Sequence, residues 1–425
     1  MLEKVVSVRT IDFFDKNNLF SPYQFGFRSK LSTEYAVIDI YEKLLKNLDD
    51  GQHSCAIFLD LAKAFDSVSH NILLKKLEKY GIRGNALMFF ASYLQSRKQF
   101  VKLNNVISDC ALIEFGVPQG SILGPLLFLI FINDLPSASN FFIRLFADDT
   151  FLCAKNSSIS LLNSQTNTEL KKVYDWLLSN RLTLNISKSK FMIISKKKRD
   201  GNFSVQINGL ELEECESYKY LGIYIDKNLS WKAHVEHVGK KLSRACGALA
   251  KMLHYDSVDV LKNIYYALIN SYVRYGLIVW GNTSFENLQP LRVLTNRAVR
   301  IMSFAPFGRL DIQPIYKHFN ILDVDNTFLL ESVKFIYKLK NSLIPSDISI
   351  ASHFIRNTNS INNYSLRSRT CTTTVPHNLL SVYAQKSIQN RMSILWNNIP
   401  MEVIESGSFN SFKAQYKKHL LLLIE

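Results

Sequence analysis

The stretch FIRLFADDTFLC, residues 142–153, places two adjacent aspartates, Asp148 and Asp149, between two runs of mostly hydrophobic residues. Two such runs around a short acidic segment predict a β-hairpin with the aspartates at its tip. Successive side chains on a strand point to opposite faces, so the two carboxylates diverge unless the turn twists one of them. We therefore expect one aspartate to act as the main ligand and the other to support it.

A third aspartate, Asp60, ends the short hydrophobic segment SCAIFL, residues 54–59, which predicts a buried strand. If Asp60 and Asp148 lie on neighbouring strands, their carboxylates converge and repel each other, and a divalent cation relieves that repulsion. Carboxylate oxygens together with substrate phosphates suit Mg²⁺, and two such ions assist phosphoryl transfer.

An ordinary structural explanation stays open for each of these features. Aspartates are common in turns because they bond to their own backbone, and an aspartate after a strand also caps helices. Taken one at a time, the features favour that explanation, and only their combination points to a site.

Composition limits the class of protein. The chain has 425 residues, a formal net charge of +15, 47% hydrophobic residues and 20% charged residues. This predicts two or three domains with a sizeable core and argues against wholesale disorder. The basic balance suits a nucleic-acid partner and equally suits plain solubility.

Cysteine usage and apolar runs argue against other classes. The six cysteines form no CxxC pair, which argues against a zinc knuckle. The first ten residues, MLEKVVSVRT, lack the apolar core of a signal peptide, and the apolar run at residues 123–132 is too short to span a bilayer. We expect a soluble, intracellular protein without membrane association.

Periodicity predicts a mixed α/β part up to about residue 225 and an all-α part after it. The predicted helices cover residues 5–16, 34–47, 72–80, 85–96, 126–135, 168–179, 235–253, 258–275 and 288–303, with a mostly helical tail over 320–425 that a polar segment at 357–374 interrupts. The predicted strands or extended segments cover residues 54–59, 99–106 (an edge strand), 142–153 (the hairpin), 182–194, 203–207 and 220–225.

Several segments follow one another in a family-specific order. They are QFGFRSKLST (24–33), FLDLAKAFDSVSH (58–70), GVPQGSILGPLLF (116–128), FADD (146–149), LTLNISKSKF (182–191) and YLGIYIDKNLSW (220–231). In these segments the chain resembles the reverse transcriptases, most closely those of non-LTR (LINE-type, jockey-like) retrotransposons. Looser matches continue into the C-terminal half.

The resemblance implies an α+β fold: a right-hand polymerase palm, with an antiparallel sheet backed by helices, then an all-α thumb and a helical C-terminal region. The implied domains are a remnant of the fingers and palm entry (1–53), the palm (54–227), a thumb-like region (228–305) and the C-terminal region (306–425). The implied function is RNA-directed DNA synthesis, in which a primer 3′-hydroxyl attacks a dNTP and pyrophosphate leaves, assisted by two Mg²⁺ ions. The implied partners are an RNA template, a DNA primer and dNTPs, and no stable protein partner can be inferred.

The resemblance also implies roles for single residues. Asp60 and Asp148 would bind the metal ions, with the backbone carbonyl of Leu61 as a further ligand and Asp149 in support. Phe65 would be the aromatic gate that leaves no room for a 2′-hydroxyl, the group that distinguishes RNA from DNA building blocks. Packing in the core is the alternative for Phe65.

Further residues are implied to contact the substrates. Gln119 and Gly120 would contact the incoming nucleotide and the template, and Lys188 would approach the triphosphate and protonate the leaving pyrophosphate. An ordinary Pro/Gly turn and a solvated lysine are the alternatives. The predicted nucleic-acid contacts are Arg28, Lys240, Lys241 and Arg244, and the basic run KKKR at 196–199 is either a nuclear address or a solvated turn.

The chain also departs from the family pattern. An R-P-I-S-L segment with its preceding basic residues, an endonuclease domain, an RNase H pattern and a CCHC knuckle are not evident in the sequence. We therefore expect an N-terminally truncated chain with intact palm motifs and low or absent polymerase activity. An RNA-dependent RNA polymerase is a rival that Phe65 argues against, and a non-catalytic nucleic-acid-binding remnant is a rival that the sequence leaves open.

Overall fold

The computed structural model describes residues 1–197, 201–255, 257–304, 311–345 and 381–423. The chain forms two compact units, residues Met1–Ala36 with Gly51–Cys215 and residues Val37–Asp50 with Glu216–Glu425. Helix α2 (Thr33–Asp49) contributes its first turn to the first unit and its remainder to the second. The division into four domains that the sequence suggested stays a prediction.

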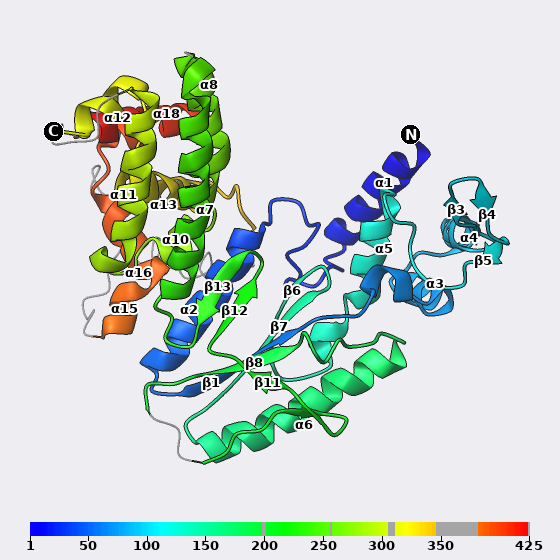
Figure 1. The fold of residues 1–425 in the computed structure, drawn as a ribbon. Coiled ribbons are helices and arrows are strands. Elements are labelled where there is room, and N and C mark those ends of the chain that lie inside the picture. Colours follow the sequence, from blue (N-terminus) through cyan, green and yellow to red (C-terminus); the bar gives the residue numbers. More distant parts are fainter. Residues whose placement is uncertain (198–200, 256, 305–310, 346–380, 424–425) are drawn as a thin grey trace, which may run out of the picture. The chain divides into compact units, whose positions relative to one another are not determined.

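A five-stranded sheet forms the centre of the first unit, in the order β11-β8-β1-β7-β6 (Figure 1). The strands are β1 (His53–Leu59), β6 (Phe142–Phe146), β7 (Asp149–Asn156), β8 (Lys190–Ile194) and β11 (Glu213–Glu214). Every residue of β1 is buried, because β1 lies between β7 and β8 and both of its faces are covered. All pairs are antiparallel except β11 with β8, which is parallel. The predicted α+β class is confirmed.

Helices cover this sheet and complete its core. Helix α6 (Ile159–Ser179) packs on β1 and β7, and helix α5 (Leu123–Ile132) packs against α1 (Leu2–Lys16) and α3 (His70–Lys79) (Figure 1). The α5 sequence, LGPLLFLIFI, is apolar on all sides, and nine of its ten residues are buried, as expected for a fully enclosed helix. It begins three residues earlier than its periodicity predicted. Helix α4 (Gly84–Leu94) and the 3₁₀ turns η1 (Ala64–Ser67) and η2 (Leu135–Ser137) complete the helices of this unit.

The predicted edge strand at residues 99–106 is wrong. The region instead forms short pairs, β2 (Lys98–Gln99) with β5 (Ala111–Leu112) and β3 (Lys102–Leu103) with β4 (Val106–Ile107). Its apolar residues Val101 and Leu103 are 69% and 72% exposed, so the alternation in the sequence does not correspond to a buried face.

Two other extended predictions are interrupted by turns. Within residues 182–194, only β8 is a strand, because residues 186–188 form a turn in which the Asn185 carbonyl accepts from the Ser189 amide. Residues 220–225 span a hairpin of β12 (Ser217–Tyr220) and β13 (Ile223–Asp226), since Leu221 and Gly222 adopt positive φ values of 46° and 83°. The predicted strand at 203–207 shortens to β9 (Gln206–Ile207), which pairs with β10 (Leu210–Glu211).

The second unit is helical after the β12–β13 hairpin, as predicted for the described residues beyond 228. Helix α7 packs on α11, and α13 packs on α16 and α18. Its elements are α7 (Lys232–Lys251), η3 (Met252–Tyr255), α8 (Val258–Tyr265), the π-helical turn η4 (Tyr266–Asn270), α9 (Ser271–Arg274), α10 (Leu277–Trp280), α11 (Phe285–Met302), α12 (Gln313–Phe319), α13 (Val324–Lys340), α15 (Val382–Lys386), α16 (Ile388–Asn397), α17 (Met401–Ile404) and α18 (Phe409–Leu422). The polar segment at 357–374 and the end of the KKKR run, residues 198–199, lie outside the described residues.

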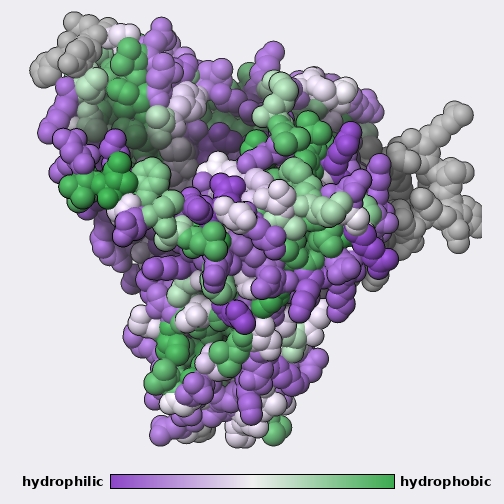
Figure 2. Space-filling model, turned by 90° about the vertical axis from the view of Figure 1, so that its right-hand side faces the viewer, coloured by the Kyte–Doolittle hydropathy of each residue, from purple (hydrophilic) through white to green (hydrophobic). Residues whose placement is uncertain are grey.

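The surface is mixed in character. On the face that Figure 2 shows, hydrophobic patches interrupt a mostly hydrophilic surface. Large apolar side chains that are at least half exposed include Val8, Met88 and Ile122. Within the described ranges, every helix is too short or too polar to cross a membrane.

Candidate active site

The tip of the β6–β7 hairpin holds the two adjacent aspartates. Phe146 pairs with Asp149, so Ala147 and Asp148 form a two-residue turn and Asp149 is the first residue of β7. Ala147 has a φ of 55°, in the left-handed region that tight hairpin turns require. Asp148 is half-buried and Asp149 is exposed, whereas the flanking residues Leu145 and Thr150 are at most 1% exposed. The predicted hairpin is confirmed, and its apolar flanks are the buried strands that position the tip.

The third carboxylate, Asp60, follows β1 directly. Strand β1 pairs with β7 in a register that ends at Leu59 opposite Thr150, so the next position brings Asp60 alongside Asp149. The Asp60 backbone is fixed on its other side, because its N–H donates to Ser189 Oγ (3.1 Å) and its carbonyl accepts from the Asn185 N–H (2.8 Å). Its side chain is 33% exposed. The structure thus brings Asp60 to the hairpin tip, as the sequence predicted.

Leu61 lies one residue further along the same chain. It is buried and bridges to Leu184, with flanking hydrogen bonds made by the Asp60 carbonyl and the Ala62 N–H. In this antiparallel pattern the backbone N–H and carbonyl of Leu61 point away from Leu184.

The three carboxylates influence one another electrostatically. Burial raises the pKa of Asp148, and the nearby charge of Asp60 raises it further. Although the Asp149 side chain is exposed, surrounding protein atoms partly desolvate it, and this desolvation, followed by the charges of Asp148 and Asp60, raises the pKa of Asp149 to about 6. Like charges gathered in a partly desolvated place favour protonation or a bound cation.

The oxygen atoms gathered at the hairpin tip suit a divalent metal ion by type. Two carboxylates and a backbone carbonyl are hard oxygen donors of the kind that Mg²⁺ binds, and their mutual repulsion is what a cation would relieve. Among the described residues, no group of three or more His, Cys, Asp or Glu side chains is placed so that it could hold a metal ion. The residues therefore fit Mg²⁺ by donor type, and any further ligands would have to come from the backbone, the substrate or water.

Lys188 lies beside the carboxylates. Its Nζ is 4.0 Å from Asp60 Oδ2, and its side chain is 69% exposed. An ion pair this long and this exposed contributes little to stability. The ammonium group is therefore available for other anions at the same place.

Phe65 is half-buried in a group of aromatic rings. Its ring stacks on Phe128 with centroids 4.5 Å apart and meets Phe27 edge to face at 6.4 Å. Its carbonyl accepts from the Val117 N–H (2.9 Å), which ties η1 to the loop of residues 116–122. These contacts hold the ring in place and suit both the core-packing and the gate interpretations.

Two further predicted residues lie on that loop. Both are exposed, and Gln119 Nε2 donates to Asp66 Oδ1 (2.8 Å) while Gly120 has a φ of 78°. The conformation of Gly120 is one that glycine adopts without strain.

The predicted nucleic-acid contacts differ in how exposed they are. The Arg28 guanidinium donates to the Ser21 carbonyl (3.4 Å), pairs with Asp15 (3.5 Å) and lies 4.4 Å from the Phe20 ring centroid, which holds it against the protein. On α7, in the second unit, Lys240 pairs with Glu236 (2.7 Å) and Lys241 lies 5.9 Å from the Tyr272 ring centroid. Arg244 is exposed.

The hairpin tip is held in place by Gln24, which is 1% exposed and was not among the predicted site residues. Its Oε1 accepts from the N–H groups of Gly26 (2.8 Å) and Ala147 (3.0 Å), and its Nε2 donates to the Ala147 carbonyl (3.4 Å). The loop backbone adds two bonds to Leu145, through the Phe25 N–H (2.8 Å) and the Tyr23 carbonyl (2.9 Å). The signals for this role were its place at the start of the segment QFGFRSKLST and its position between two aromatic residues.

Gly26 allows the loop to approach the tip this closely. A Cβ added there would lie 2.3 Å from the Ala147 nitrogen and 2.9 Å from the Phe146 carbonyl carbon, both backbone atoms. Only glycine fits without moving the turn that carries Asp148.

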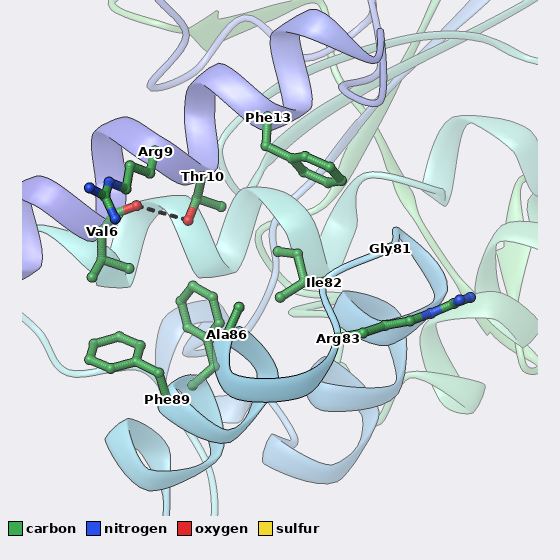
Figure 3. Close-up of a pocket in the computed structure, with 10 residues that line it drawn as sticks. Val6, Arg9, Thr10, Phe13, Gly81, Ile82, Arg83, Ala86 and Phe89 are labelled. Carbon is green, nitrogen blue, oxygen red and sulfur yellow. Dashed lines mark hydrogen bonds between the residues drawn. The ribbon is translucent and has the colours of Figure 1, made fainter.

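A separate groove lies between α1 and α4 (Figure 3). It has a volume of about 390 Å³ and is mainly apolar, and the two arginines among its lining residues are exposed. The residues that line it are Val6, Arg9, Thr10, Phe13, Gly81, Ile82, Arg83, Ala86, Phe89 and Phe90. None of them belongs to the predicted site.

Comparison with known proteins decides the family. The family model described as "Reverse transcriptase (RNA-dependent DNA polymerase)" matches residues 1–225, more than half of the chain. The chain belongs to the reverse transcriptase family. The aspartates at the hairpin tip and after β1 lie within the matched region.

Curated relatives point to the same family. The chain is 27% identical over 323 residues to the probable RNA-directed DNA polymerase from transposon BS of Drosophila melanogaster, an alignment covering 72% of this chain and 35% of the relative. It is 27% identical over 320 residues to the RNA-directed DNA polymerase from mobile element jockey of the same species, covering 72% and 34%. The chain thus spans about a third of the length of these relatives, and the predicted likeness to jockey-like reverse transcriptases is confirmed.

Solved structures of Candida telomerases are also similar. Telomerase from Candida tropicalis in complex with a TWJ fragment of telomeric RNA gives a TM-score of 0.42 at 10% identity, covering 99% of this chain and 56% of that one. The apo telomerase of the same species gives 0.41 at 11%, covering 82% and 60%. These low scores add nothing to the family match.

Proposed function

We propose that this chain carries the catalytic palm of an RNA-directed DNA polymerase of the non-LTR retrotransposon type. The observation that supports this best is the gathering of Asp60, Asp148 and Asp149 at one end of the sheet, within the region that matches the reverse transcriptase family. The curated relatives named for the same activity support it further.

Asp60, Asp148 and the Leu61 carbonyl would hold two Mg²⁺ ions, with Asp149 in support. When bound, such ions lower the pKa of an attacking hydroxyl and stabilise the charge on the leaving oxygen. The protein's own contribution is to hold these oxygens on buried strands, so that little reorganisation is needed during the reaction.

Other residues bind and orient the substrates in this proposal. Lys188, 4.0 Å from Asp60, offers its ammonium group to the triphosphate and a proton to the leaving pyrophosphate. Gln119 and Gly120, exposed on their loop, contact the incoming dNTP and the RNA template. Arg28, Lys240, Lys241 and Arg244 contact phosphates of the template and primer.

The test is primer extension on poly(rA)/oligo(dT) with Mg²⁺, comparing the unchanged chain with Asp148→Asn. The matched control is Asp175→Asn, which makes the same change at an exposed aspartate on α6. We expect weak extension by the unchanged chain, a rate about a hundredfold or more lower in Asp148→Asn, the cost of removing one positioned charge-stabilising group, and an unchanged rate in the control.

Two outcomes would contradict the proposal. Extension at an unchanged rate in Asp148→Asn would show that the reaction does not need the carboxylates at the hairpin tip. No extension by the unchanged chain under any condition, together with RNA binding that weakens with salt, would favour a non-catalytic nucleic-acid-binding protein.

The proposed role of Phe65 as a gate against ribonucleotides is tested separately, by measuring which nucleotides the Phe65→Ala variant incorporates. Replacing the ring with a methyl group in Phe65→Ala opens space beside Phe128, so a 2′-hydroxyl no longer meets an obstacle. We expect ribonucleotide incorporation relative to deoxynucleotide incorporation to rise about tenfold or more, equivalent to about 1.4 kcal/mol. An unchanged ratio in a folded variant would leave Phe65 as a packing residue only.

A further inference from the structure

A small pocket in the second unit is lined by side chains from four helical segments. The turn η4 and helix α9 contribute Tyr266, Asn270 and Arg274, α13 contributes Thr327, Leu330 and Glu331, α18 contributes Lys413 and Lys417, and the segment before α13 contributes Ile321 and Leu322. Its volume is about 140 Å³. That is the space of roughly four or five water molecules, enough for a phosphate-sized group.

Positive charge exceeds negative charge in this pocket. Glu331 is its one lining acid, and it is shared, since it accepts from Arg274 Nε (2.7 Å) and from Lys334 Nζ (2.5 Å). A single carboxylate that pairs with two cations cannot also balance Lys413 and Lys417. Lys417 Nζ donates to the Asn320 carbonyl (2.6 Å), a neutral acceptor that orients the ammonium group and leaves its charge in place.

The cations destabilise one another. Burial lowers the pKa of Lys417, and the charges of Lys262, Lys413 and Arg274 lower it further. Burial also lowers the pKa of Lys334, with Arg274 and Lys413 adding to the effect and Glu331 opposing it. An anion placed among these groups would relieve the repulsion, because an opposite charge nearby favours the charged form of each.

The segment that forms one wall of the pocket also has an unusual backbone conformation. Residues Tyr266–Asn270 form a π-helical turn between α8 and α9. Such turns are rare and are frequent at functional sites. The turn places Tyr266 and Asn270, both with polar side-chain groups, among the residues that line the pocket.

We propose that this pocket binds a phosphate group, held by Lys413, Lys417 and Arg274. The ligand chemistry is a phosphate oxygen cluster, supplied either by the backbone of a nucleic acid or by free phosphate. The pocket shares no residue with the carboxylate site, so it binds whether or not the chain synthesises DNA.

The experiment uses the full chain and two variants on one helix. Lys413→Gln removes an exposed cation of the pocket, and Lys418→Gln makes the same charge change on α18 at an exposed residue outside it. Binding of a fluorescein-labelled 12-nucleotide poly(U) RNA is measured by anisotropy from 50 to 300 mM KCl. Thermal unfolding is measured with and without inorganic phosphate at matched ionic strength, which also verifies that each variant folds.

If the pocket holds a backbone phosphate, Lys413→Gln weakens RNA binding about fourfold at 150 mM salt relative to Lys418→Gln, and its salt slope falls by about 0.7, the value for one phosphate of a single strand. If it holds free phosphate, phosphate raises the unfolding temperature of the unchanged chain and of Lys418→Gln but not of Lys413→Gln, and RNA binding is equal in both variants. Equal behaviour of the two variants in both measurements would overturn the proposal.

Discussion

The hairpin tip of the first unit and the cationic pocket of the second both concentrate charge of one sign, but they do so by different means. At the tip, two of the three carboxylates are neighbours in sequence, and the strand register from Leu59–Thr150 brings in the third. In the pocket, Arg274 and Lys417 come from helices far apart in the sequence. The tip rests on buried strands and a buried glutamine, whereas Lys413 is exposed. A rigid tip suits chemistry, and an adaptable, solvated lysine suits the binding of a phosphate.

The largest expected effect separates these two roles directly. Asp148→Asn should reduce primer extension about a hundredfold or more, whereas Lys413→Gln should change extension at saturating template by less than about fourfold. RNA affinity should show the reverse order. If the two variants affect the same quantity to the same extent, the distinction between a catalytic and a binding region fails.

Gly26→Ala tests how rigidly the tip is supported. The added Cβ meets backbone atoms of Phe146 and Ala147 that cannot yield without moving the turn, so we expect a loss of about 3 kcal/mol in the free energy of unfolding. The matched control is Gly247→Ala on α7, where a Cβ meets nothing within 4 Å and a helical alanine should stabilise by about 0.5–1 kcal/mol. Urea unfolding measures both, and a neutral Gly26→Ala would show that the loop and tip move freely.

Gln24→Met removes the hydrogen bonds that the Gln24 side chain makes to Gly26 and Ala147, and it keeps a side chain of similar volume. The Gly26 and Ala147 N–H groups lose their acceptor, which should cost about 2 kcal/mol of unfolding free energy. Primer extension should fall about tenfold through kcat, since misplaced reacting groups slow the chemistry.

The control for that prediction is Gln206→Met, at an exposed glutamine of the same unit. A stability loss without any change in kcat would make Gln24 a purely structural residue. The stability result does not depend on the proposed polymerase activity.

The smallest effect is a pH dependence at Asp149. The folded chain holds a proton on this carboxyl up to a pKa of about 6, against 3.8 for an ordinary aspartate. Between these values the folded state binds more protons than the unfolded state, so the free energy of unfolding falls as pH rises from about 4 to about 6. Asp149→Asn should lack this part of the decline.

Urea unfolding without Mg²⁺ at pH 4, 5, 6 and 7 measures this difference between the unchanged chain and the variant. Plotted against pH, the free energies of unfolding of the two proteins should converge or cross between about pH 4 and about pH 6 and run parallel above that range. Curves that are parallel throughout would show that the neighbouring charges do not act on Asp149. Lys413→Gln keeps Asp149, so it should show the same decline as the unchanged chain.

The sequence predicted the parts of the molecule that depend on local pattern. Apolar runs around an acidic pair gave the hairpin, an apolar run before Asp60 gave β1, and ordered motifs gave the family. The prediction from sequence failed where hydrophobic and polar residues alternate but the hydrophobic side chains stay exposed. Val101 and Leu103 alternate in residues 99–106, but both are exposed on short β pairs outside the main sheet.

By itself, then, the sequence determined the α+β class, the family and the three carboxylates, because each depends on residue type and on spacing along the chain. Only the tertiary structure decided what supports and what surrounds them. The bonds from Gln24 to Ala147 cross more than a hundred positions of the chain, and the pocket of Arg274, Lys413 and Lys417 exists only once its helices pack. Hydrogen bonds and repelling charges act over a few ångströms of space. The separation of two residues along the sequence does not show whether they lie that close in the folded chain.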